Sequence, residues 1–174
     1  PVELGAKYAA EGADELVYLD ISATEEGRQT FTELVSRIAA WIDIPFTVGG
    51  GIRSVEDAAR LLDAGADKIS LNSAAVADPS LIDAIAARYG SQFVVAAIDA
   101  RQIDGRWQVT THGGKRATER ELFTWAREAV DRGAGEVVVA FIFTRHRQHP
   151  QSREYESNIF ELFHDKMIVS KCYH

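Results

Sequence analysis

The sequence predicts an α/β fold in which parallel β-strands are covered by α-helices. Short apolar runs alternate with amphipathic segments along the chain, and this alternation favours parallel strands joined by helices. In addition, one junction occurs three times: a glycine that ends a helix, two linking residues, and a charged residue that enters a strand. These junctions begin at Gly12, Gly65 and Gly133. Such repetition is more typical of a (β/α) barrel than of a doubly wound sheet.

Each element is predicted from its own pattern. Apolar residues at helical spacing predict helices over residues 2–11, 31–41, 55–64 and 119–132, and one that begins near Pro79. Nearly continuous apolar runs predict strands over residues 15–21, 46–48, 68–71, 93–98 and 136–142. The pair Asp104–Gly105 predicts the turn of an antiparallel hairpin that leads into residues 111–115. Residues 158–164 are compatible with one or two helical turns, and residues 167–172 with a further strand.

Composition limits the classes of function. The chain has 174 residues, 46 % hydrophobic and 26 % charged, which fits one domain or part of a larger one. The net charge of −7 argues against a nucleic-acid surface, and no apolar run approaches the roughly 20 residues that span a membrane. The single cysteine, Cys172, excludes an internal disulfide pair and fits a reducing, cytoplasmic compartment.

The chain divides by character near residue 140. We expect residues 1–140 to form a partial (β/α) barrel and residues 141–174 to form an atypical C-terminal tail, which begins with a basic, turn-like stretch. The tail holds four of the five histidines, but their spacing matches no metal-ligand pattern. We therefore expect no metal and no cofactor.

The stretch from Phe46 to Ser54 organises the rest of the chain. A short apolar run enters three consecutive glycines, residues 49–51, and Ser54 is a plausible N-cap of the helix that follows. Bare glycine backbone allows a ligand to approach closely, and free N–H groups between a strand and a helix favour phosphate. A plain tight turn is the alternative interpretation.

Polar residues follow several of the predicted strands. They are Asp20, the glycines 49–51, Asn72, Ser73, Asp99 and Thr111. In a barrel these strand ends share one face, which is where active sites lie. Asp20 and Asp99 are candidates for proton transfer or hydrogen bonding, or alternatively for caps of the loops that follow them. The amides of Gly50 and Gly51 and the side chains of Asn72 and Ser73 could hold a phosphate. At the opposite strand ends, Glu15, Lys68 and Glu136 would form a mixed-sign ring if they point inward; three solvated charges are the alternative.

Five runs in the chain resemble a known family. They cover residues 19–24, 46–53, 65–75, 95–100 and 111–115. They closely resemble the cyclase subunit of imidazole glycerol phosphate synthase, an enzyme of histidine biosynthesis, and the match extends from Pro1 to about Val139. The resemblance implies a (β/α)8 TIM barrel, present here as a partial barrel of about five to six parallel strands with covering helices.

The resemblance also implies an activity. The family takes ammonia from a glutaminase subunit, acts on a bisphosphorylated ribulosyl-formimino nucleotide, and releases imidazole glycerol phosphate and an aminoimidazole carboxamide ribotide. By resemblance, Asp99 is a general acid/base and Asp20 a supporting aspartate of the pocket. Positions 50, 51, 72 and 73 match a binding site for one substrate phosphate. Glu15, Lys68 and Glu136 match members of an ammonia gate, and Asp67 matches a residue that faces the glutaminase.

The chain departs from the family pattern in three places. It opens at Pro1 without a start methionine, and the resemblance begins after the family's first strand, which carries another essential aspartate. The last two strands, with the second phosphate site, are also unmatched. Arg145 stands where the family has an aspartate. We therefore expect an impaired cyclase, with a non-catalytic phosphate-binding partial barrel or an inactive truncated product as alternatives.

Open sheet edges would follow from a partial barrel. The edges would be residues 16–19 and 137–139, whose unpaired backbone groups favour pairing with a second copy. We therefore expect a homo-oligomer. The alternative is that the tail folds back and covers the opening within one chain.

Overall fold

The computed structural model describes residues 1–19, 25–143 and 167–173, and gives only the backbone for residues 25–30, 143 and 167–173. The helices are α1 (Val2–Ala10), α2 (Glu25–Ala39), α3 (Val55–Asp63), α4 (Ser73–Ala77), α5 (Ser80–Tyr89), the short 3-10 turn η1 (Ser91–Phe93) and α6 (Leu122–Asp131). The strands are β1 (Leu16–Leu19), β2 (Phe46–Gly49), β3 (Lys68–Leu71), β4 (Val94–Ile103), β5 (Arg106–Thr111), β6 (Arg116–Glu121), β7 (Glu136–Phe143) and β8 (Met167–Tyr173).

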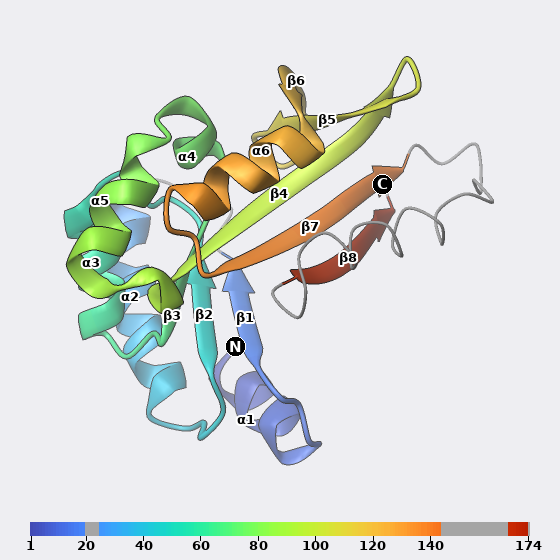
Figure 1. The fold of residues 1–174 in the computed structure, drawn as a ribbon. Helices are drawn as coiled ribbons and strands as arrows, with labels where there is room; N and C mark the ends of the chain where they lie inside the picture. The colour runs from blue at the N-terminus through green and yellow to red at the C-terminus, as the bar shows by residue number, and fades with distance from the viewer. Residues whose placement is uncertain (20–24, 144–166, 174) are drawn as a thin grey trace.

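The strands form one twisted sheet (Figure 1). Its parallel part has the order β1-β2-β3-β4-β7-β8, which confirms the predicted α/β fold of about six parallel strands. Strand β4 continues past the end of β3 and pairs antiparallel with β5, which in turn pairs with β6. The turn of this hairpin has positive φ at Asp104 (50°) and Gly105 (78°), as the sequence predicts.

One of the two predicted open edges is wrong. Strand β8 pairs in parallel with β7 from the Val137–Met167 pair to the Phe143–Tyr173 pair, so residues 137–139 have a neighbour on both sides. Residues 167–172 are therefore a strand, as their pattern allowed. At the other side, β1 pairs only with β2 among the described strands, so its outer edge agrees with the prediction.

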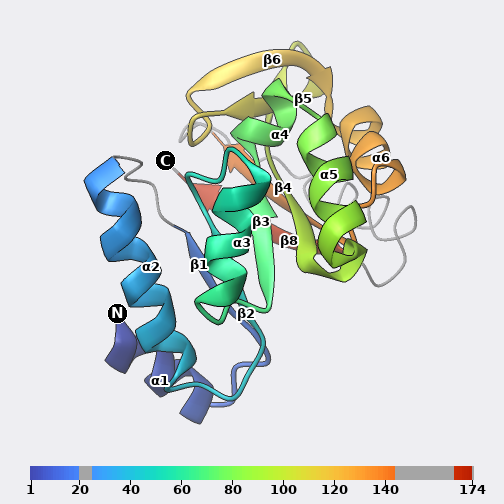
Figure 2. The ribbon, with the colours of Figure 1, turned by 90° about the vertical axis from the view of Figure 1, so that its left-hand side faces the viewer.

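The hydrophobic core lies between the sheet and the helices on one of its faces. Figures 1 and 2 show α2, α3 and α5 side by side over this face, with α6 beyond them. In β2, β3 and β4, alternate residues point into this core, including Val48, Ile69 and Ile98, which are at most 1 % exposed. The helices contribute apolar residues such as Ile82 and Trp125. We call this helix-covered face the outer face and the opposite one the inner face.

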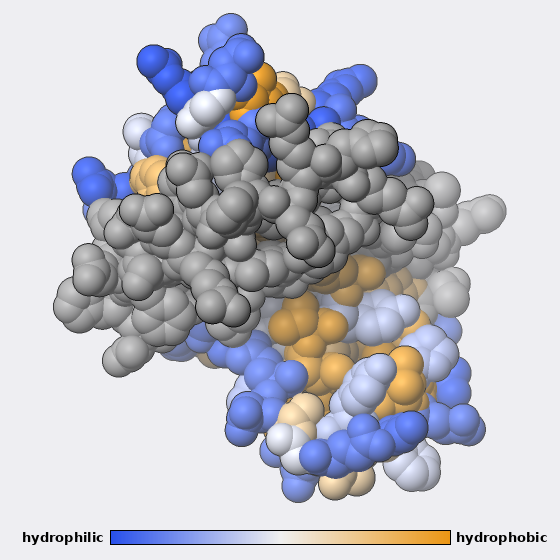
Figure 3. Space-filling view, turned by 90° about the vertical axis from the view of Figure 1, so that its right-hand side faces the viewer, coloured by the Kyte–Doolittle hydropathy of each residue, from blue (hydrophilic) through white to orange (hydrophobic). Residues whose placement is uncertain are grey.

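The inner face of β1 is apolar and exposed. Val17 and Leu19 keep 50 % and 57 % of their surface exposed. Figure 3, which views the molecule from the side opposite to Figure 2, shows hydrophobic residues exposed beside the grey ones. Among the described residues, no helix has both the length and the hydropathy needed to cross a membrane.

Several element boundaries differ from the sequence prediction. Helix α2 begins at Glu25 rather than residue 31. Helix α6 begins at Leu122 rather than residue 119, because the preceding three residues belong to β6. The Glu121 carboxylate then caps α6 by accepting hydrogen bonds from the N–H groups of Phe123 (3.0 Å) and Thr124 (2.8 Å). Strand β6 and the five-residue helix α4 were not predicted. The suggested helical turns over residues 158–164 lie outside the described residues.

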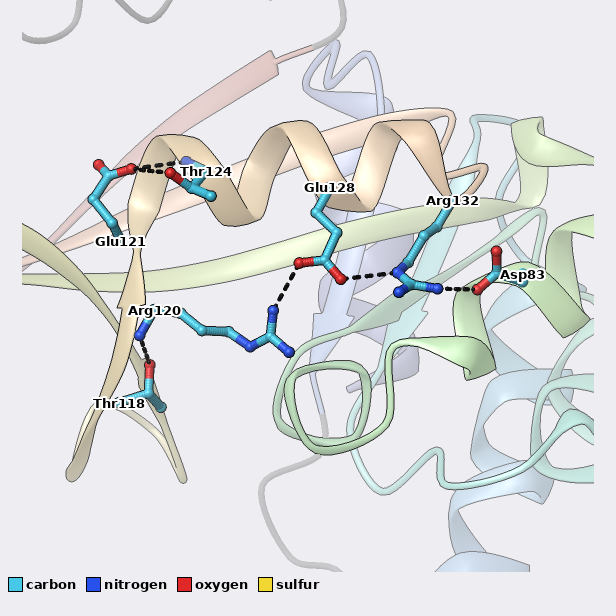
Figure 4. Close-up of polar contacts among 7 residues, drawn as sticks. All are labelled: Asp83, Thr118, Arg120, Glu121, Thr124, Glu128 and Arg132. Atoms are coloured by element: carbon cyan, nitrogen blue, oxygen red, sulfur yellow. Dashed lines mark hydrogen bonds and ion pairs between the residues drawn. The ribbon is translucent and has the colours of Figure 1, made fainter.

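A chain of ion pairs joins the hairpin to two helices (Figure 4). Arg120 of β6 contacts Glu128 of α6 at 2.8 Å, Glu128 contacts Arg132 at 3.0 Å, and Arg132 reaches Asp83 of α5 at 2.7 Å. Partial desolvation raises the pKa of Glu128, but the hydrogen bond from Arg132 and the charge of Arg120 outweigh it, so this pKa lies below 4.5. The network therefore holds β6 against the helical layer at neutral pH.

The N-cap of α3 provides a test of the loop after β2. The hydroxyl of Ser54 accepts from the N–H of Asp57 at 3.2 Å, and the Asp57 carboxylate accepts from the N–H of Arg53 at 2.8 Å. We expect Ser54→Ala to lower the free energy of unfolding by about 1 kcal/mol, because an orphan amide loses its acceptor. Urea denaturation measures this change. Ser54→Asp is the control, since its carboxylate keeps the cap; equal losses in both variants would contradict the capping role.

Candidate functional site

The inner face carries the polar residues that the sequence analysis singled out. Strand alternation and register place Lys68 and Ser70 of β3, Asp99 of β4 and Glu136 of β7 on this face. The parallel strands share one direction, so their carboxyl ends lie along one edge of the sheet. Groups near Asp99 and groups near Lys68 therefore lie at opposite ends of the same face.

At the carboxyl ends, Asp99 is held by neighbours on both sides. The side-chain amide of Asn72 donates to its carboxylate oxygen Oδ2 at 3.0 Å, and the Thr110 hydroxyl donates to its backbone carbonyl at 3.1 Å. The oxygen of the same amide, Asn72 Oδ1, is buried and has no hydrogen-bond partner among the described residues. The arrangement fixes a carboxylate beside an amide, which can hold or transfer a proton at the end of β4.

The glycine stretch has the backbone conformation that only glycine adopts readily. Gly50 and Gly51 have φ values of 104° and 68°. Gly49 is constrained in another way, because a Cβ added there would lie 2.7 Å from Leu19 Cδ2 and 2.8 Å from Ser70 Cβ. The chain therefore turns at residues 50–51 with bare backbone, next to the capped start of α3, as a phosphate site requires.

Ser73 follows β3 and contacts the hairpin. Its hydroxyl accepts a hydrogen bond from the backbone N–H of His112 at 3.0 Å. The same loop is fixed again two residues later, where Arg101 donates to the carbonyl of Gly114 at 2.9 Å. The sequence analysis included residues 111–115 in the family resemblance but gave His112 no role. The one feature of the sequence that could have indicated a role for His112 is its position in that run, directly after a predicted strand.

At the amino ends of the strands, three charges converge as the repeated junction predicts. The Lys68 ammonium lies 3.0 Å from Glu15 Oε2 and 2.7 Å from Glu136 Oε1. Glu15 also accepts a hydrogen bond from the Thr47 hydroxyl at 2.5 Å. The mixed-sign cluster is therefore present, whereas its role as an ammonia gate stays a prediction.

Burial and the two carboxylates act in opposite directions on Lys68. Desolvation lowers the pKa of the ammonium, but the hydrogen bonds and charges of Glu136 and Glu15 outweigh it, so the pKa lies above its ordinary value of 10.5. Lys68 is therefore positively charged at neutral pH and holds both glutamates.

One predicted site residue, Asp67, lies apart from these clusters, and another lies outside the described residues. Asp67 is exposed, and its carboxylate accepts from the backbone N–H of Phe46 at 2.8 Å, which ties the starts of β2 and β3 together. Asp20 lies outside the described residues. Among the described residues, no three His, Cys, Asp or Glu side chains cluster in a way that could hold a metal ion.

The chain has a parallel sheet, helices on its outer face, and polar groups at the carboxyl ends of its strands. These features define the (β/α)-barrel class, and this chain forms part of such a barrel. The sequence model of the family described as "Histidine biosynthesis protein" matches residues 1–144. The chain belongs to this family.

The curated relatives carry a more specific name. The chain is 59 % identical over 138 residues to the imidazole glycerol phosphate synthase subunit HisF of Bacteroides thetaiotaomicron, covering 79 % of this chain and 55 % of the relative. The subunit of the same name from Myxococcus xanthus is 57 % identical over 142 residues, covering 82 % and 56 %. The chain thus spans about half the length of these relatives.

A third alignment extends further along the chain. The HisF subunit of Flavobacterium johnsoniae is 52 % identical over 170 residues, covering 98 % of this chain and 68 % of the relative. This alignment therefore reaches into residues 141–174. The division at residue 140 into a barrel part and an atypical tail stays a prediction.

The charge cluster generates a stability prediction with a defined pH dependence. Because the folded-state pKa of Lys68 is raised, its contribution to stability is fully present below pH 10.5 and is lost as the pH rises through the folded-state pKa. We expect Lys68→Met to lower the free energy of unfolding by about 2 kcal/mol near pH 8, since two carboxylates then face each other. Near pH 11 the difference from the wild type should shrink.

Urea denaturation at both pH values measures this effect. Lys7→Met is the matched control, because Lys7 forms a 3.7 Å pair with Glu11 in which both side chains are at least 60 % exposed. We expect that control to change stability by less than about 0.5 kcal/mol. Two results would show that the cluster does not stabilise the fold. One is a loss of stability in Lys68→Met that is no larger than the loss in Lys7→Met, and the other is a Lys68→Met loss that does not shrink above pH 10.5.

Proposed function

We propose that this chain is a cyclase subunit of imidazole glycerol phosphate synthase in histidine biosynthesis whose own activity is impaired. Its substrate would be a bisphosphorylated ribulosyl-formimino nucleotide, which ammonia converts to imidazole glycerol phosphate and an aminoimidazole carboxamide ribotide. The observation that carries the proposal is the 59 % identity to a HisF subunit over 138 residues, which include Asp99 and the glycine stretch. The pathway and the reducing environment that suits Cys172 favour a cytoplasmic location.

The residues predicted to follow the strands have separate roles in this proposal. Asp99 acts as the general acid/base, and its hydrogen bond from Asn72 supports this role because it fixes the carboxylate at the strand end. The amides of Gly50 and Gly51, with Asn72 and Ser73, bind one substrate phosphate. Asp20 supports the chemistry in the pocket.

The opposite end of the face would serve ammonia delivery. Glu15, Lys68 and Glu136 form the gate, and their ion pairs at the amino ends of the strands support this assignment. A glutaminase subunit supplies the ammonia there, and the exposed Asp67 faces that partner. Ammonia would then cross the inner face towards Asp99.

Binding of the bisphosphorylated nucleotide to the 174-residue chain, measured by calorimetry, tests the phosphate site. We expect Ser73→Ala to weaken binding about tenfold, because a hydroxyl that can donate to the phosphate is lost. Ser91→Ala is the matched control, since Ser91 is an exposed serine at the amino end of β4 and should leave binding unchanged. No binding to the wild-type chain would contradict the proposal.

Turnover with ammonium is the second readout of the same experiment. The expected impairment stays a prediction, and we expect no product above background from this chain alone. Turnover that falls about 10²–10⁴-fold in Asp99→Asn would contradict the impairment and support the role of Asp99. Nucleotide binding without turnover would favour the non-catalytic, phosphate-binding alternative.

We also propose that the chain forms a homo-oligomer through the edge and inner face of β1. The support is the unpaired outer edge of β1 among the described strands and the exposure of Val17 and Leu19. Two copies related by a two-fold axis would cover this surface. Sedimentation at micromolar concentration should give a mass above the 19.2 kDa of one chain.

A charge on the inner face of β1 should disrupt this contact. We expect Val17→Lys to shift the mass towards that of one chain, because a lysine opposes burial of the strand. Leu4→Lys is the control, since Leu4 is also 50 % exposed but lies on α1. A wild-type mass of 19.2 kDa that does not change with concentration would contradict the oligomer.

A further inference from the structure

We infer that His112 is a further anion-binding residue, whose imidazole ring contacts the substrate phosphate held at residues 50, 51, 72 and 73. The inference rests on the proposed function of that phosphate site and adds a ligand from a different element. His112 lies in the loop between β5 and β6, 39 positions along the chain from Ser73. The hairpin would thereby complete a site whose other members follow β2 and β3.

The position of His112 is fixed by its backbone. Its N–H donates to the Ser73 hydroxyl at 3.0 Å, so the backbone of His112 directly contacts a residue proposed to bind the phosphate. Since the Ser73 oxygen is the acceptor in this bond, the hydroxyl hydrogen remains able to donate to an anion. Ser73 and His112 can therefore contact the same group at once.

The loop around His112 is held at a second point. Arg101 of β4 donates to the carbonyl of Gly114 at 2.9 Å. Gly114 also packs against the end of β7, because a Cβ added there would lie 2.1 Å from Ile142 Cδ1. Because the loop is fixed at residues 112 and 114, the His112 side chain starts from a defined position. The entropy that is lost when this side chain is ordered on binding is therefore smaller.

His112 adopts the left-handed backbone conformation, which is uncommon for residues other than glycine. Its φ is 56°, and the next two residues, Gly113 and Gly114, have φ values of 64° and 78°. Glycine would fit position 112 without strain, yet a histidine is present there. Strained backbone is retained where the side chain has a use, and the exposed imidazole is the group that distinguishes this residue from its glycine neighbours.

The orientation of the ring leaves one nitrogen available. Nδ1 lies 3.1 Å from the Thr111 hydroxyl, and Nε2 has no hydrogen-bond partner among the described residues. When the Thr111 hydroxyl donates to Nδ1, the ring hydrogen is on Nε2, and in the protonated ring both nitrogens carry hydrogen. In these two forms, but not in the neutral tautomer whose hydrogen is on Nδ1, Nε2 can donate to a phosphate oxygen. The side chain of the buried Thr111 thus orients the ring for an anion.

A titration of the full 174-residue chain with inorganic phosphate, followed by NMR, tests the inference. In the wild type we expect the backbone amide signals of Gly50 and Gly51 and the ring proton signals of His112 to shift with one common dissociation constant. In His112→Gly we expect that constant to rise about tenfold, because one hydrogen bond to the anion is lost. The backbone at position 112 should persist, since glycine favours this φ.

Asp104→Gly is the matched control. Asp104 is the other non-glycine residue with positive φ, 50°, among the described residues, and it lies at the exposed tip of the β4–β5 turn. We expect this variant to bind phosphate as the wild type does. Both glycine variants should unfold at a temperature no lower than the wild type, which would exclude loss of folding as the cause of weaker binding.

Three outcomes would overturn the inference, and they are distinguishable. Amide shifts at residues 50 and 51 with an unchanged dissociation constant in His112→Gly would overturn the role of His112 and leave the phosphate site intact. The absence of shifts at those amides in the wild type would overturn the phosphate site, and with it the role of His112. Shifts of the His112 ring alone, without those of the glycines, would also contradict a shared site.

Discussion

The contact of Lys68 with two glutamates is the constraint on which the shape of the sheet depends. Glu15 enters β1 and Glu136 begins β7, and each of these strands lies two places from β3 in the sheet. Adjacent strands lie about 4.8 Å apart, so a flat sheet would place such groups roughly 10 Å from the axis of β3. One lysine can reach both carboxylates because the sheet curves towards its inner face. The ion cluster therefore requires the barrel-like curvature of the sheet.

That curvature separates two environments on one face. All six strands of the parallel part point the same way. Residues at the amino ends of the strands therefore gather at one end of the face, and residues at the carboxyl ends gather at the other. The first group is the Lys68 cluster, which is charged and internally paired. The second group contains Asp99 and Asn72, together with glycine backbone and the hairpin loop. The proposed transfer of ammonia from one end to the other follows from this polarity.

The sequence predicted those parts of the fold that local pattern determines. The repeated glycine junction placed Glu15, Lys68 and Glu136 at equivalent positions, and the Asp104–Gly105 pair identified the hairpin turn. Strand β6 was not predicted because its sequence shows no apolar alternation; it reads Arg-Ala-Thr-Glu-Arg-Glu. Among the described strands it pairs only with β5. The contact of His112 with Ser73 could not be predicted, because it depends on how far β4 extends beyond β3. Family resemblance, rather than pattern, provided the roles of the site residues.

Strand β4 extends beyond the part that pairs with β7, and this determines where the chain can accept an insertion. β4 pairs with β7 at seven successive positions, from Val95 to Arg101, and the Asp99–Ala140 pair lies inside this zone. The register at Asp99 is thus fixed by β7, whereas the tip at residues 104–105 lies beyond it. Loop tips of this kind accept inserted peptides and fused domains more readily than paired strands do. A reporter or a binding module grafted between Asp104 and Gly105 would therefore project from the chain and leave the strand that carries the carboxylate undisturbed.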